Sequence, residues 1–111
     1  MHYVSTRGHS AEVTFSQAVA QGLAPDGGLY VPQVLPDLTE VIAGCAGMTY
    51  QETAYTFLRH FATDMEPAWL RKIIDKSYTL FDVPEVAPLR RLDEKLFVLE
   101  LFHEFKSRFV F

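Results

Sequence analysis

At 111 residues, with 49% of them hydrophobic and 22% charged, the chain has the length and balance of one soluble globular domain. A net charge of −4, with the lysines and arginines scattered along the chain, argues against nucleic-acid binding and against a basic membrane-binding patch. A lone cysteine, Cys45, rules out an intrachain disulfide, and no apolar run reaches the roughly 20 residues of a membrane span, so we expect a cytoplasmic protein.

The first third of the chain predicts a strand, a short helix and a second strand. Residues 3–6 favour a strand. Thr14 and Gln17 have the spacing of a capping box, and an apolar pattern of helical period follows over residues 15–22. A tight Pro-Asp-Gly-Gly turn and a short strand that ends at a proline then occupy residues 25–32.

The middle of the chain predicts helices. Asp37 and Glu40 repeat the capping-box spacing, which indicates a helix of one or two turns. The same spacing recurs at Thr49, where a longer apolar pattern begins. We interpret Thr49–Thr63 and Pro67–Phe81 as an antiparallel helix pair, since a proline is tolerated in the first turn of a helix. The apolar stripes place five residues in its core: Phe57, Phe61, Leu70, Ile74 and Tyr78.

Two strands are predicted after the helices. Residues 89–92 favour a short strand, and Phe97–Phe102 is the strongest strand signal in the chain. The apolar residues of that second segment are nearly continuous, which is typical of a strand covered on both faces. The expected fold is therefore α+β, a small domain with short strands at both ends and a central antiparallel helix pair.

A few polar residues could carry chemistry. Ser5, Thr6 and Arg7 together offer hydroxyls and a guanidinium that could hold a phosphate or a carboxylate, although we favour the simpler interpretation of a strand end with a solvated arginine. The two glycines of the turn could form an anion-binding nest, but Asp26 beside them would repel a phosphate, which favours an ordinary turn. The four histidines share no metal-ligand spacing, so no metal site is expected.

Three blocks of this sequence, in this order, resemble the amino-terminal domain of threonine synthases. They are STRG at residues 5–8, the segment 15–32 with its LAPDGGLY turn, and LELFH at residues 99–103. The resemblance implies a threonine synthase amino-terminal domain over residues 1–103. It also implies an enzyme family of lyases that use pyridoxal phosphate (PLP) to convert O-phosphohomoserine to threonine and phosphate.

In that family a similar Leu-Phe-His block continues into a Gly-Pro-Thr segment and a lysine that forms the Schiff base with PLP. Here His103 is followed by EFKSRF, so Lys106 aligns with that lysine through a gap, and residues 104–111 are interpreted as a divergent tail. The chain has no counterpart of the family's phosphate-binding loop. The resemblance therefore implies a fragment that is inactive alone, holds no PLP, and has the missing PLP-binding region as its partner.

Two other functions are compatible with the sequence. The same fold could act as a stand-alone interaction module that docks onto a protein partner. The chain could also be a small-anion binder built on Arg7. An interaction module would be well behaved in solution with one defined apolar patch, whereas an isolated fragment would expose apolar surface more widely and associate.

Overall fold

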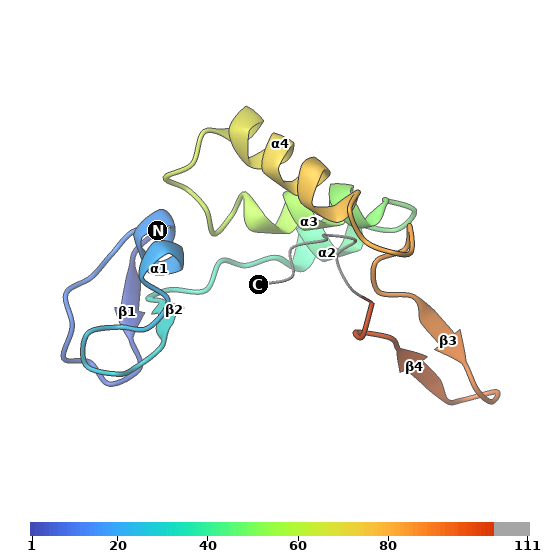
Figure 1. Ribbon diagram of the computed structural model, residues 1–111, viewed down its shortest axis with the longest axis horizontal. Helices are drawn as coiled ribbons and strands as arrows, with labels where there is room; N and C mark the ends of the chain where they lie inside the picture. Colours follow the sequence, from blue (N-terminus) through green and yellow to red (C-terminus); the bar gives the residue numbers. More distant parts are fainter. Residues whose placement is uncertain (104–111) are drawn as a thin grey trace.

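The computed structural model describes residues 1–103, which form three parts arranged along the chain (Figure 1). The N-terminal lobe, residues 1–32, contains two strands and a helix. The helix pair, α3 and α4, follows a short helix α2, and the hairpin, residues 89–99, lies apart from both. The elements are β1 (Tyr3–Ser5), α1 (Phe15–Gln21), β2 (Tyr30–Pro32), α2 (Thr39–Ala43), α3 (Tyr50–Leu58), α4 (Pro67–Tyr78), β3 (Leu89–Arg91) and β4 (Phe97–Leu99). The predicted α+β class and element order are confirmed.

In the N-terminal lobe, helix α1 packs against a small two-stranded sheet. Strands β1 and β2 pair antiparallel, with Ser5 opposite Tyr30. The predicted capping box at the start of α1 is present, because the side chain of Thr14 accepts from the backbone of Gln17 and the side chain of Gln17 accepts in return. A small apolar cluster fills the space between helix and sheet, and its buried members are Tyr3, Val13 and Ala18.

The helix pair is the second packed region. Its capping box at Thr49 and Glu52 is present, and Pro67 occupies the first turn of α4 as predicted. Helix α3 nevertheless ends at Leu58 instead of continuing to residue 63. The backbone N–H of Ala62 and the N–H of Phe61 both bond to the carbonyl of Leu58, so the chain tightens into a turn there.

The burial predicted for the helix pair holds in part. Leu70 and Ile74 are buried with Ala62 in the central cluster. Phe57, Phe61 and Tyr78 are only half-buried, although Tyr78 packs against this cluster. The expected place in the core was therefore wrong for Phe57 and Phe61.

The helix α2 forms where one was predicted, but without the predicted capping box. Its N-cap is Leu38, whose side chain makes no capping bond. The carboxylate of Asp37 instead accepts from the backbone N–H and the hydroxyl of Thr39, at 3.0 and 2.7 Å. Asp37 thus closes a local turn one residue before the helix.

The N-terminal lobe and the turn between α3 and α4 are joined by polar contacts and one shared ring. The hydroxyl of Tyr3 donates to the carbonyl of Phe61 at 3.0 Å, and the backbone N–H of Ser16 donates to Asp64 at 3.1 Å. The ring of Phe15 packs against both apolar clusters. These contacts join the N-terminal lobe and the helix pair into one packed body within residues 1–78, while residues 33–48 between them are mostly exposed.

The hairpin, unlike the packed body, is not covered by other described elements. Strands β3 and β4 pair antiparallel, with Leu89 opposite Leu99, and β4 ends at Leu99 rather than at residue 102. Phe97 is 49% exposed, Val98 40% and Leu99 54%. Strand β4 therefore has the apolar pattern of a strand covered on both faces, but no described element covers it.

The overall dimensions are larger than those of a compact domain. The radius of gyration is 16.6 Å, whereas a compact domain of this length has about 13 Å. The accessible surface is 8376 Å², compared with about 6,200 Å² for a folded monomer of the same mass. Among the described residues, no helix is long and apolar enough to cross a membrane.

Candidate functional site

The STRG block and the Pro-Asp-Gly-Gly turn, 20 residues apart in sequence, lie side by side. The hydroxyl of Ser5 donates to Oδ1 of Asp26 at 2.7 Å, and Nη1 of Arg7 donates to the backbone carbonyl of Asp26 at 2.9 Å. The hydroxyl of Thr6 accepts from the backbone N–H of Leu29 at 3.0 Å. The fold therefore gathers all three predicted contact residues around the turn.

The carboxylate of Asp26 is the centre of this arrangement. Besides Ser5, it accepts from the backbone N–H of Gly28 at 2.9 Å and from the backbone N–H of His9 at 3.0 Å. The bond from Ser5, with those from the two backbone amides, holds the pKa of Asp26 well below its usual range. Asp26 is therefore ionised at neutral pH and engages the Ser5 hydroxyl and the Gly28 N–H, two of the donors that sequence analysis considered for an external anion.

The two glycines allow this close approach. Gly27 has a φ of +79°, and a Cβ there would lie 2.9 Å from Nη1 of Arg7. A Cβ on Gly28 would overlap the hydroxyl of Ser5. The close approach of the turn to the end of β1 therefore needs a glycine at residue 28, and the positive φ of the turn favours one at residue 27.

Sequence reasoning placed Ser5, Thr6 and Arg7 at a site but missed Asp26 as its organiser. The signal was present, because an aspartate before two glycines can fold its side chain back onto nearby backbone donors. The arrangement is a clasp for an internal carboxylate and offers no nucleophile or base. A role of Ser5, Thr6 and Arg7 in contacting a substrate stays a prediction, and Lys106 lies outside the described residues.

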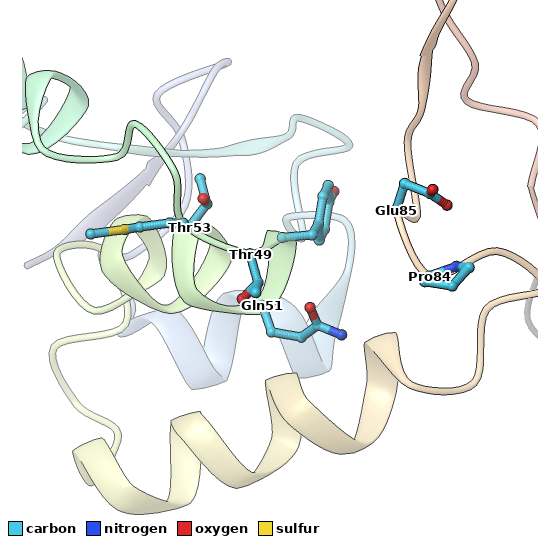
Figure 2. A pocket seen from close by; sticks show the side chains of 7 residues that line it. Thr49, Gln51, Thr53, Pro84 and Glu85 are labelled. Carbon is cyan, nitrogen blue, oxygen red and sulfur yellow. The ribbon is translucent and has the colours of Figure 1, made fainter.

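A second feature is an open hollow of about 650 Å³ between the start of α3 and the loop before β3 (Figure 2). Thr49, Gln51 and Thr53 line one side, and Pro84 and Glu85 face them across the gap. The hydroxyl of Thr49 is already engaged in the capping box of α3. The hollow is lined by no histidine, lysine or cysteine, so it offers no catalytic group of those kinds.

Comparison with known proteins identifies the family. The family model described as "Threonine synthase N terminus" matches residues 2–78, and the chain belongs to this family. The chain is 45% identical over 105 residues to the threonine synthase of Pseudomonas aeruginosa, and 37% identical over 106 residues to human threonine synthase-like 2. Its structure matches that of PLP-bound threonine synthase from Brucella melitensis with a TM-score of 0.85 and 42% identity.

These matches cover most of this chain but a small part of each relative. The two sequence matches span 93% of this chain and 22% of each relative, and the Brucella match spans 93% of this chain and 23% of that one. The chain thus corresponds to less than a quarter of the length of these relatives. The part matched by the family model, residues 2–78, coincides with the packed body.

Proposed function

We propose that this chain is the amino-terminal part of a threonine synthase and acts as a scaffold that packs against the PLP-binding region of that enzyme. The parent reaction would be the conversion of O-phosphohomoserine to threonine and phosphate. In this proposal the chain supplies packing and part of a cleft wall, and it is inactive alone. Family membership supports the parent enzyme, while the scaffold role is supported by the hairpin.

The observation that carries the proposal is the apolar hairpin with both faces and both edges uncovered. Within residues 1–103 the sheet that contains it has only β3 and β4. A two-stranded sheet is marginal in water, and an exposed apolar pair of strands readily accepts another strand or layer. The relatives continue for more than three quarters of their length beyond the matched part, which would provide that layer.

The described residues do not fit PLP. Its phosphate needs a cradle of free donors, but the Ser5 hydroxyl and the backbone N–H groups of His9 and Gly28 already donate to Asp26, whose negative charge would repel a phosphate. We therefore place the groups that hold PLP outside residues 1–103. When bound in the parent enzyme, PLP would supply the electron sink for the reaction.

The stand-alone interaction module remains the alternative. The exposed hairpin would serve a foreign partner as well as it would serve the parent enzyme. The two functions differ in which protein covers the hairpin and in whether the resulting complex has activity.

Complementation between separately made pieces tests the proposal. The chain would be co-produced with Pseudomonas aeruginosa threonine synthase that lacks its matching first fifth, and phosphate release from O-phosphohomoserine would be measured. We expect no activity from either piece and activity from the pair. Leu99→Asp, which puts a charge on the exposed face, should abolish complementation, whereas Thr39→Ala on α2 should not. A soluble pair that neither associates nor releases phosphate would contradict the proposal.

A further inference from the structure

The side chain of His103 lies between two carboxylates from different parts of the chain. Its Nε2 is 2.8 Å from Oε2 of Glu100, directly after β4, and its Nδ1 is 3.2 Å from Oδ2 of Asp82, in the loop after α4. Nε of Arg90, in β3, contacts the other oxygen of Glu100 at 3.2 Å. The imidazole thus connects the end of the hairpin to the loop that leaves the helix pair.

This geometry fits a protonated ring better than a neutral one. An imidazolium donates from both nitrogens, so it can bond to both carboxylates at once. A neutral imidazole donates from one nitrogen, and its other nitrogen presents a lone pair, which a carboxylate oxygen repels. The bond to Glu100, followed by the bond to Asp82, raises the pKa of His103, and the bond from His103 lowers the pKa of Glu100.

The two contacts differ in strength. The distance to Glu100 is the shorter one, and Glu100 is further held by Arg90, with 16% of its side chain exposed. The side chain of Asp82 is 48% exposed and can turn into water at small cost. Loss of the proton should therefore leave the ring bonded to Glu100 and release Asp82.

We propose that His103 is a pH-sensitive latch, closed when its ring is protonated and opened at Asp82 when the ring is neutral, which sets the direction of the hairpin relative to the helix pair. Among residues 1–103, the charged groups in ion-pair contact with the ring or its partners are Asp82, Glu100 and, through Glu100, Arg90. The latch also fixes the position of the chain at residue 103. It does not depend on the proposed function, since every group in it belongs to this chain.

Energy transfer between α4 and the hairpin tip tests the latch on the intact chain. Trp69 is the single tryptophan, and it lies in α4. With Cys45→Ser and Glu94→Cys, one acceptor dye can be attached at the exposed hairpin turn. Transfer would be followed from about pH 5 to 9, beside an NMR titration of the His103 ring. We expect a single step in energy transfer as the pH changes, with the same midpoint as the His103 titration. That midpoint should lie above the ordinary histidine pKa of about 6.5.

Variants of Asp82 separate a latch from a general pH effect. In Asp82→Asn, the side-chain amide can accept from the ring or donate to it, so the contact should persist and the step should disappear. In Asp82→Ala, transfer should stay at the high-pH value throughout. Glu85→Gln, which removes an exposed charge from the same loop, is the matched control and should keep the step.

Three results would overturn the proposal. The first is constant transfer across the range in the parent chain. The second is a step that survives unchanged in both Asp82 variants. The third is a His103 titration midpoint at or below about 6.5, which would mean that the carboxylates do not favour the protonated ring.

Discussion

The N-terminal lobe and the hairpin contain the same local structure with opposite surroundings. Each has two antiparallel strands of three residues. In β1, Tyr3 is 6% exposed and Ser5 is 5% exposed. In the hairpin, every strand residue is exposed, although Phe97, Val98 and Leu99 are more apolar as a group than the residues of β1. Hydrophobicity of a strand is thus a poor guide to its burial when its covering layer is not among the described residues.

The difference lies in what each pair of strands contacts. Strand β1 has α1 on one side and the Asp26 clasp at its end, and the hydroxyl of Tyr3 donates to Phe61 in the turn after α3. The hairpin is attached through the loop after α4 and through His103. Strand β1 is therefore covered, although Val19, Leu23 and Leu29 elsewhere in the lobe are exposed, whereas both strands of the hairpin are without cover among the described residues.

The largest contrast should appear when large apolar residues are truncated. Ile74→Ala, in the packed body and 3% exposed, should reduce the free energy of unfolding by about 2–5 kcal/mol. Leu99→Ala, its match in the hairpin, should change it by about 0.5 kcal/mol or less, because the side chain already contacts water. Denaturant titration of both variants measures the two changes in the free energy of unfolding. Equal losses would show that the hairpin is packed in solution.

The Asp26 clasp predicts an effect of acid on the N-terminal lobe. The folded pKa of Asp26 is depressed below its unfolded value of about 3.9, so its contribution is present above that pH and is lost as the pH falls toward the folded pKa. Asp26→Asn should lower the midpoint of unfolding at pH 7 and remove this part of the acid dependence. Thermal melts from pH 7 to pH 2 on both proteins check this. Identical melts at all pH values would contradict a role for the carboxylate.

The smallest effect concerns the start of α3. Thr49→Ala removes the hydroxyl that accepts from the backbone N–H of Glu52 at 3.2 Å, and it should cost about 1 kcal/mol. Thr53→Ala, within the same helix, is the control, and alanine there should be neutral or slightly stabilising. A larger loss at Thr53 than at Thr49, measured by denaturant titration, would contradict the capping interpretation.

Local signals in the sequence were sufficient for the start of most elements. The capping boxes at Thr14 and Thr49 and the proline at Pro67 begin helices where predicted, because each depends on residues within one turn. The end of α3 was missed because it is set by the packing of Ala62 against the helix pair, which sequence periodicity does not contain. The Asp37 box failed because a local turn to Thr39 competes for the same carboxylate.

Only one of the two segments that form the candidate site could be recognised from the sequence. The STRG block was recognisable from its residue types, but its partner Asp26 lies 21 residues after Ser5, and only the folded chain brings the two together. The exposure of the hairpin agrees with the fragment that the resemblance implies, whereas the apolar pattern alone indicates a covered strand. Family resemblance therefore supplied what local physics could not.

We propose above that the hairpin is an interface for the rest of a threonine synthase. Hydrogen–deuterium exchange tests it most directly, comparing the amides of residues 89–99 in the chain alone with the same amides in a fusion to the remainder of the Pseudomonas enzyme. We expect the amides of residues 89–99 to exchange rapidly in the monomeric chain and to be strongly protected in the fusion, while the amides of α4 stay protected in both. Equal exchange of the hairpin amides in the two proteins would contradict the proposal that the hairpin is an interface.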